Sequence, residues 1–271
     1  MLPFRLIADM QGAAEFAPFG NATALVDSPL FMYQFSSPAI SAHLRQLIFQ
    51  QNSIGLTCLA LPERSWQAIF FDMDSTVIAE ESIVELARAA GKEAEVEALT
   101  TAAMAGQIDF EASLRQRVAL LKGLPIERLE EVRERLQINR GMHAFMSAAK
   151  KLSIKLFLVS GGFNCLAESI ADELGFNGFL ANQLEIKEQK LTGQMDGPII
   201  DGVAKANFLR KICQYHNIKL SDAVAIGDGA NDIPMMQAAG AAIGYHPKPI
   251  LFPHINGANF HDHRLLIPAL L

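Results

Sequence analysis

The sequence of 271 residues has few cysteines and no long apolar run, and these shortages exclude several classes of protein. Cys58, Cys165 and Cys213 are odd in number and far apart, which fits neither a disulfide framework nor the paired spacing of a zinc site. No apolar stretch approaches the roughly 20 residues that span a bilayer, and the start MLPFRLIADMQG lacks the features of a signal peptide. We therefore expect a cytoplasmic protein with buried, reduced thiols and no membrane partner.

The chain also lacks an excess of positive charge. Its 23 Lys and Arg residues against 29 Asp and Glu residues give a formal net charge of −6, and the two signs are interspersed. Nucleic acid is therefore not a predicted partner. Because 50% of the residues are hydrophobic, a chain of this length can bury a sizeable core and fold as a globular protein.

From Ser65 onward, short β-rich runs alternate with helical patterns, and this alternation predicts an α/β fold, a Rossmann-like parallel sheet with helices on both faces. The runs are WQAIFF, IKLFLV, AVAIG and AAIG. Between the first two, apolar positions at helical spacing predict several helices and no strand, either as an inserted helical cap above the strand ends or as an enlarged crossover. Residues 184–194 alternate around a polar turn and predict a β-hairpin.

We expect three parts of the chain on this basis. Residues 1–64 form a small N-terminal α+β segment that carries no recognisable motif, residues 65–82 and 139–271 form the α/β core, and residues 83–138 form the helical cap. The carboxyl end, HINGANFHDHRLLIPALL, is expected to be a solvated loop before a final strand or helix, because its three histidines lack the spacing of a metal site. The sequence leaves a homodimer open.

Carboxylates follow two of the predicted strands. Asp72 and Asp74 lie in FFDMDSTVI, where the first predicted strand ends, and Asp228, Asn231 and Asp232 follow AVAIG. Ligands of an α/β sheet bind outside the carboxyl ends of its strands, so these side chains belong at one edge. Each group alone also suits a turn or a helix cap.

A third strand end adds groups that suit phosphate. The run LFLVS ends at Ser160 and continues into Gly161 and Gly162, which together offer a hydroxyl and unhindered backbone amides. Lys205 starts a helical pattern and could balance phosphate charge, although a lone Lys is more often exposed. Three carboxylates beside a phosphate site need a cation, and hard oxygen ligands indicate Mg2+.

The motifs DMDST, SGG with Lys205 downstream, and GDGANDI resemble, in this order, the successive motifs of the haloacid dehalogenase superfamily. Glu81, nine positions after Asp72, and the stretch AMAGQIDFEASLRQRVALLKGLP are similar to the phosphoserine phosphatase family within it. The resemblance covers about residues 66–252. It implies Mg2+-dependent hydrolysis of O-phospho-L-serine to L-serine and phosphate through an aspartyl phosphate, as the last step of serine biosynthesis.

The resemblance also implies a role for each matching residue. The nucleophile would be Asp72 and the general acid and base Asp74. Mg2+ would be held by Asp72, the backbone carbonyl of Asp74 and Asp228, with Asp232 supporting these ligands. The substrate would be bound by Glu81 at its ammonium, by Arg117 at its carboxylate, by Met104 and Phe110 as an apolar wall, and by Ser160, Gly161, Gly162, Lys205 and Asn231 at its phosphoryl group.

Three other functions stay open at this point. A related phosphatase or phosphotransferase could act on another small molecule, such as phosphohomoserine, through the same phosphoaspartate. A phosphoacceptor signalling module would also place an Asp on such a sheet, but it needs neither Asp74 nor a helical cap. A catalytically silent binding protein would not need Asp72, Asp74, Lys205 and Asp228 together.

Overall fold

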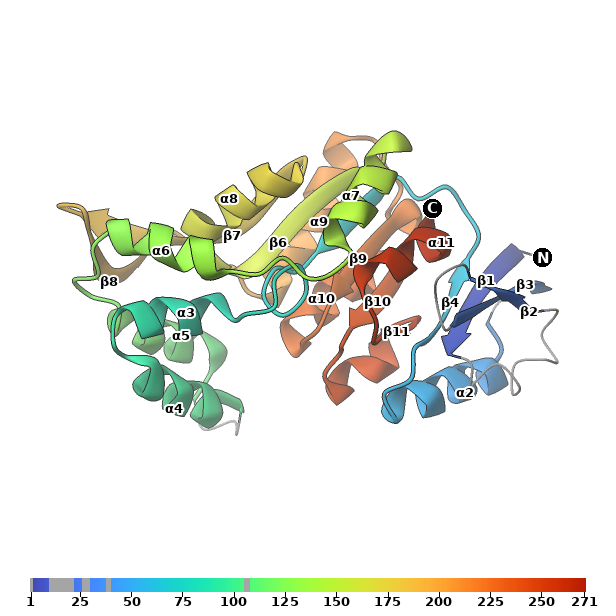
Figure 1. The fold of residues 1–271 in the computed structure, drawn as a ribbon, viewed down its shortest axis with the longest axis horizontal. Coiled ribbons are helices and arrows are strands. Elements are labelled where there is room, and N and C mark those ends of the chain that lie inside the picture. The colour runs from blue at the N-terminus through green and yellow to red at the C-terminus, as the bar shows by residue number, and fades with distance from the viewer. Residues whose placement is uncertain (1, 10–21, 26–29, 38–39, 105–107) are drawn as a thin grey trace.

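The computed structural model describes residues 2–9, 22–25, 30–37, 40–104 and 108–271. Within these residues, eleven strands form one sheet in the order β2-β3-β1-β4-β11-β10-β9-β5-β6-β7-β8 (Figure 1). Their bounds are β1 Leu2–Asp9, β2 Ala22–Ala24, β3 Leu30–Ser37, β4 Cys58–Pro62, β5 Ala68–Phe71, β6 Lys155–Phe163, β7 Gly178–Lys187, β8 Lys190–Asp196, β9 Ala223–Gly227, β10 Ala241–Tyr245 and β11 Gly257–Asn259.

The helices between these strands are short. Their bounds are α2 Ala42–Ser53, α3 Ser82–Ala89, α4 Glu93–Met104, α5 Phe110–Ala119, α6 Glu127–Arg135, α7 Met142–Lys151, α8 Asn164–Leu174, α9 Gly202–Tyr215, α10 Ile233–Ala238 and α11 Leu266–Leu270. Short 3-10 turns are η2 Leu220–Asp222, η3 Ala230–Asp232, η4 Pro249–His254 and η5 His263–Leu265. No helix among the described residues is long and apolar enough to cross a membrane.

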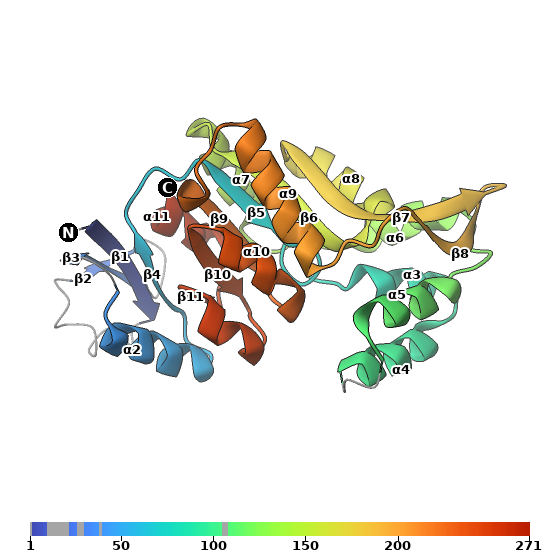
Figure 2. The same cartoon turned by 180° about the vertical axis from the view of Figure 1, so that it is seen from behind.

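The centre of the sheet is parallel and buried on both faces. Strand β5 pairs in parallel with β6 on one side and with β9 on the other. Because strand side chains alternate, Ile69 and Phe71 pack into one core with α7, α8 and α11, whereas Ala68 and Phe70 pack into another with α9 and α10. Figures 1 and 2 show these two helical layers from opposite sides, and they confirm the predicted fold class.

The helices α3 to α6 form a cluster beyond the carboxyl ends of the strands, at one end of the molecule in Figure 1. They share a core of their own, whose members include Leu86, Val96, Leu114, Leu121 and Val132. The predicted hairpin, β7 with β8, packs on this cluster. The amide of Gly123 donates to the carbonyl of Leu191, and the amide of Leu191 donates to Leu124.

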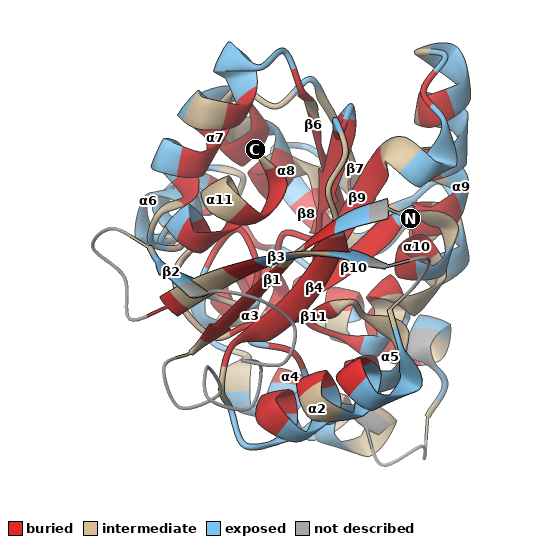
Figure 3. Ribbon diagram, turned by 90° about the vertical axis from the view of Figure 1, so that its right-hand side faces the viewer, coloured by how far each residue is buried: buried red, intermediate tan, exposed pale blue. Residues whose placement is uncertain are grey.

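The N-terminal strands continue the sheet without a break. Strand β4 pairs antiparallel with β11, and β1 pairs with β4 and β3. Ile7 and Leu59 pack into the same core as α7 and α11, while α2 covers the opposite face of these strands. Figure 3 shows the buried stretches of β1 and β4 between these two layers.

The expectation of a solvated loop at the carboxyl end is wrong. His263 is fully buried, and the aromatic ring of Tyr245 stacks on its imidazole with 4.1 Å between ring centroids. His261 pairs with Asp9 of β1 at 2.9 Å. The segment is therefore packed between the N-terminal strands and the core, because its histidines find partners that lie far away in the sequence.

Candidate active site

The three chemical motifs meet at the carboxyl ends of the central strands. Asp72 directly follows β5, and Asp228 directly follows β9, the neighbouring strand. The amide of Asp72 donates to the carbonyl of Ile226 at 2.8 Å, which fixes the position of the carboxylate relative to β9. Ser160, Gly161 and Gly162 lie near the end of β6, in the stretch between Val159 and Phe163 where the pairing of β6 with β7 is irregular.

A buried lysine lies between the carboxylates. The Nζ of Lys205 contacts Asp72 Oδ1 at 2.6 Å and Asp232 Oδ1 at 2.8 Å, and none of its side chain is exposed. Burial lowers the pKa of Lys205, but Asp232 and Asp72 outweigh this effect and raise it, so the ammonium keeps its charge. Burial and the charge of Asp232 raise the pKa of Asp72, and the contact with Lys205 opposes that rise.

Asp232 shapes the loop after β9. Its Oδ2 accepts hydrogen bonds from the amides of Asp228 and Gly229, each at 3.2 Å. Any side chain at Gly227 would collide with the Asp232 carboxyl group, so only glycine allows this close approach. Both oxygens of Asp232 are thus engaged, whereas Asp72 and Asp228 each have a lysine on one oxygen only and keep the other for a bound ion or substrate.

The carboxyl groups fit a hard divalent cation. One oxygen of each of Asp72, Asp228 and Asp232 lies within 4.8 Å of the others, and all three residues are buried. Buried carboxylates at this spacing repel one another unless a cation balances them, and Lys205 supplies only one charge. Mg2+ prefers a site with few protein carboxylates, in which substrate oxygens and water supply the other ligands.

Asp74 has an environment different from that of Asp72. Ser82 Oγ donates to Asp74 Oδ2 at 2.8 Å, and Asp74 Oδ1 is buried without a partner among the described residues. Burial, followed by the charge of Glu81, raises the pKa of Asp74 to about 7. A carboxyl group with this pKa can donate and accept a proton near neutral pH.

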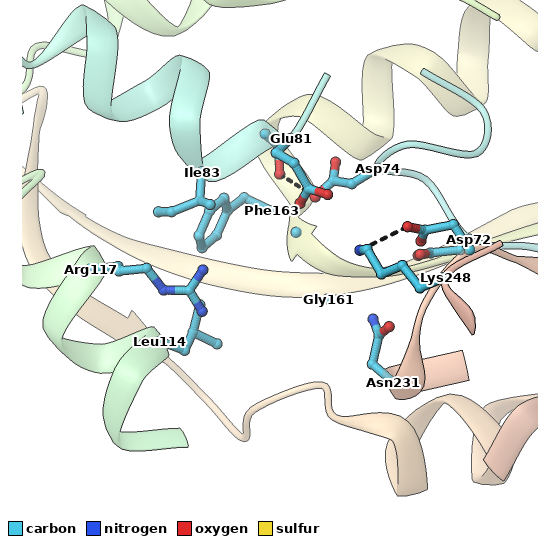
Figure 4. A pocket seen from close by; sticks show the side chains of 13 residues that line it. Asp72, Asp74, Glu81, Ile83, Leu114, Arg117, Gly161, Phe163, Asn231 and Lys248 are labelled. Carbon is cyan, nitrogen blue, oxygen red and sulfur yellow. Dashed lines mark hydrogen bonds and ion pairs between the residues drawn. The ribbon is translucent and has the colours of Figure 1, made fainter. Parts of the chain in front are cut away.

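A pocket of about 100 Å³ opens between the strand ends and the helical cluster. Figure 4 shows Glu81 and Arg117 reaching it from the helical side, while Asp72 and Asn231 reach it from the sheet side. The pocket is lined by Asp72, Asp74, Glu81, Ser82, Ile83, Leu114, Arg117, Gly161, Gly162, Phe163, Asp228, Asn231 and Lys248.

Most of the predicted site residues line this pocket, and Ser160, Lys205 and Asp232 lie behind its wall. Ser160, Lys205 and Asp232 are fully buried, and Ser160 Oγ accepts from the amide of Gly162 at 2.8 Å. The side chains of Met104 and Phe110 lie outside the described residues, so the predicted apolar wall stays a prediction.

A cationic side chain that the sequence did not indicate, that of Lys248, also lines the pocket. Lys248 Nζ contacts Asp228 Oδ2 at 2.9 Å, and the Lys248 amide donates to the carbonyl of Asp228 at 2.8 Å. Lys248 lies in HPKPIL, after β10, where no motif distinguishes it from a surface lysine. Ser82, the partner of Asp74, was missed for the same reason, because only the fold brings it to the carboxyl group.

Three comparisons with known proteins agree with this geometry. Residues 69–237 match the family of haloacid dehalogenase-like hydrolases. The chain is 47% identical over 190 residues to a phosphoserine phosphatase of Polaromonas sp., a match that covers 68% of this chain and 80% of the relative.

Two solved structures resemble the fold. A phosphoaspartyl intermediate analogue of a phosphoserine phosphatase is 39% identical, with a TM-score of 0.72 over 77% of this chain and 100% of that one. A haloacid dehalogenase family hydrolase of Salmonella enterica serovar Typhi is 25% identical, with a TM-score of 0.88 over 99% of this chain and 98% of that one. The second likeness therefore includes the N-terminal strands.

Replacing the buried lysine should cost both stability and activity. Lys205→Met leaves Asp72 and Asp232 as buried charges without their partner, so we expect the free energy of unfolding to fall by about 3–5 kcal/mol and turnover to disappear. Urea unfolding measures the first effect. Lys211→Met, on the exposed face of the same helix, is the control, and a similar small loss in both variants would contradict the central role of Lys205.

The raised pKa of Asp74 predicts a pH-dependent gain in stability for Asp74→Asn in the metal-free protein. The folded state keeps this proton up to pH about 7, whereas the unfolded chain releases it near pH ~4. Wild-type stability is therefore lost as pH rises through this window, and the uncharged amide avoids that loss. We expect Tm to rise by roughly 3–6 °C near pH ~8 and to change little near pH ~4.

Thermal melts in chelator at the two pH values measure this difference, with exposed Asp172→Asn as the control. An equal gain at both pH values would show that the Asp74 carboxyl group does not carry a raised pKa.

Proposed function

The chain belongs to the haloacid dehalogenase-like hydrolase family, and from this premise we propose that it hydrolyses O-phospho-L-serine to L-serine and inorganic phosphate. It is a phosphoric monoester hydrolase. The observation that supports this substrate is that Glu81 and Arg117 line the same small pocket as the carboxylates of the strand ends. This pairing offers one anionic and one cationic group to a zwitterionic amino acid whose phosphate faces the sheet.

The first step begins with Asp72. Lys205 holds its Oδ1, so Oδ2 is the oxygen free to attack phosphorus. The new bond joins Asp72 Oδ2 to phosphorus while the bond from phosphorus to the serine oxygen breaks, and protonated Asp74 gives its proton to that oxygen. L-serine then leaves, and the aspartyl phosphate remains.

The second step reverses the role of Asp74. Its carboxylate, now ionised, takes a proton from water as the water oxygen attacks phosphorus, and the bond to Asp72 breaks. A pKa near 7 lets one group serve both steps, because neither protonation state is strongly disfavoured at neutral pH.

Mg2+ would be held by Asp72 and Asp228 together with the backbone carbonyl of Asp74, while Asp232 keeps the loop after β9 in place. The ion supplies charge neutralisation that lets an anionic nucleophile approach an anionic phosphate. The phosphoryl oxygens would be bound from the protein side by Lys205, Lys248, Asn231 and the backbone of Gly161 and Gly162.

Because the product of this reaction is L-serine, we assign the reaction to the last step of serine biosynthesis. We assign the protein itself to the cytoplasm.

Phosphate release tests this proposal. We expect the protein to release phosphate from O-phospho-L-serine faster than from O-phosphothreonine or an aryl phosphate, only with added Mg2+, and not in Asp72→Asn. Equal rates on all three esters would keep the phosphatase and discard the substrate. Transfer of phosphate to an added alcohol instead of water would favour a phosphotransferase, and a phosphohomoserine preference would favour the related phosphatase.

Substitutions of Glu81 and Arg117 should have different effects on a substrate that lacks the carboxylate. Arg117→Ala should raise KM for phosphoserine about 10-fold to 100-fold through the lost charged hydrogen bonds, but it should leave O-phosphoethanolamine, which has no carboxylate, nearly unchanged. Glu81→Gln should weaken the binding of both substrates, because both carry the ammonium group. Steady-state kinetics on the two esters measure this pattern.

Arg115→Ala is the matched control, because Arg115 lies on the same helix but is exposed and pairs with Glu111. If Arg117→Ala harmed phosphoethanolamine as strongly as phosphoserine, the assignment of Arg117 to the carboxylate would be wrong.

A further inference from the structure

The segment of residues 259–264, here called the C-terminal strap, lies against the catalytic loop, which comprises residues 72–78. The strap begins at the end of β11 and leads into α11. Its residue His263 points to the carbonyl oxygen of Thr76, two positions after Asp74, and the distance from Nε2 to that oxygen is 2.8 Å.

The imidazole of His263 is a fixed hydrogen-bond donor. A carbonyl oxygen only accepts, so Nε2 carries the hydrogen. The ring is fully buried, stacks on Tyr245 and meets Phe71 edge to face with 6.0 Å between centroids. Burial lowers the pKa of His263 to about 4, so the ring is neutral at working pH. Its Nδ1 has no partner among the described residues, so the contact with Thr76 is its one side-chain hydrogen bond there.

The accepting carbonyl belongs to a tightly wound loop. The Met73 carbonyl accepts from the amides of Thr76, Val77 and Ile78, which closes a turn around Asp74. Ser75 in this turn has a φ of 56°, a left-handed conformation that costs a residue with a side chain free energy. A strained turn of this kind needs contacts from outside to keep its shape.

Two such contacts meet at Thr76. Besides His263, Asn139 Nδ2 donates to the Thr76 carbonyl at 2.9 Å and to the Ile78 carbonyl at 3.0 Å. Asn139 lies in the segment that returns from the helical cluster, whereas His263 lies in the strap. The carbonyl is therefore held from two directions by elements distant in the sequence.

The strap is itself anchored at several points. The amide of His263 donates to the Arg140 carbonyl at 3.0 Å, and His261 pairs with Asp9 at the end of β1. Thr57 Oγ1 accepts from the amide of Phe260 at 2.8 Å. The donor on His263 thus has a rigid support, which a surface side chain would lack.

We propose that His263 is a positioning residue for Asp74, acting through the Thr76 carbonyl to hold the catalytic loop at the height where Asp74 can reach the leaving oxygen. This inference rests on the proposed function only for the role of Asp74 as the acid. Displacement of a catalytic group by about 1 Å can cost roughly 100-fold in rate, so a donor that fixes the position of the loop affects the rate of the reaction.

The dependence on the leaving group separates positioning from mere folding. A misplaced acid harms a poor leaving group, such as phenol or serine, and spares a good one, such as 4-nitrophenol, whose oxygen needs little protonation. His263→Phe keeps a flat ring in the stack but removes the donor. We expect kcat/KM to fall about 10-fold to 100-fold for phosphoserine and phenyl phosphate, and by less than about 3-fold for 4-nitrophenyl phosphate.

Two further variants serve as controls. His263→Gln places an amide donor near the position of Nε2 and should restore most of the loss. Tyr245→Leu removes the stacking partner and leaves the donor, so it should lower Tm without changing the ratio of the two aryl esters. If His263→Phe does not fold, His263→Asn replaces it, because its shorter amide does not reach the Thr76 carbonyl.

The outcomes are distinguishable from those of the proposed function. Equal losses on both aryl esters, no loss on either, or a Gln variant no better than Phe would overturn the role of His263. A wild-type protein that hydrolyses aryl phosphates but not phosphoserine would discard the substrate, while the comparison of the two aryl esters would still decide the role of His263.

Discussion

The contact of Lys205 with two carboxylates is the interaction on which the site depends. Three Asp side chains end or follow neighbouring strands, and a parallel sheet brings those ends to one edge, so their charges meet. A buried ammonium that bonds Asp72 and Asp232 together offsets that repulsion and fixes both in place. One oxygen of Asp72 is then bound to lysine and the other is left for chemistry. The helix α9 can bury the charged side chain of Lys205 only because these two carboxylates compensate its loss of hydration.

The helical cluster supplies the half of the site that recognises the rest of the substrate. It joins the core by two segments that pair with each other at Ile78 and Ile138, at the end of the catalytic loop. The hairpin of β7 and β8 extends from the sheet to the loop after α5, so the helix that carries Arg117 is attached to the core a second time. Chemistry and recognition therefore lie on separate elements, which lets substitutions in the helices change the substrate while the strand ends keep the reaction.

Much of the fold and the first layer of the site could be predicted from the sequence, because both depend on local patterns. Alternating apolar runs predict the parallel strands, and the residues that follow these runs must meet at one edge. Lys248, Ser82 and His263 could not be found in this way, because each acts through a partner that only the folded chain brings near. Ser160 to Gly162 look like a loop because glycines are rare in strands, yet β6 keeps them extended where a side chain at Gly162 would meet Asp74 and Ser82.

The two carboxylates of the motif DMDST show why distant contacts are needed at all. Residues 72 and 74 would point the same way in a continued strand, and they could then not differ in role. The turn closed on the Met73 carbonyl separates them: Asp72 faces Lys205, and Asp74 faces Ser82 and Glu81, where burial and a like charge raise its pKa. That turn contains a left-handed serine, so local preference does not hold it. Besides the bonds to the Met73 carbonyl, Asn139 and His263 hold the turn from outside through the Thr76 carbonyl, and this is why residues about 60 and 190 positions away matter to the geometry of this loop.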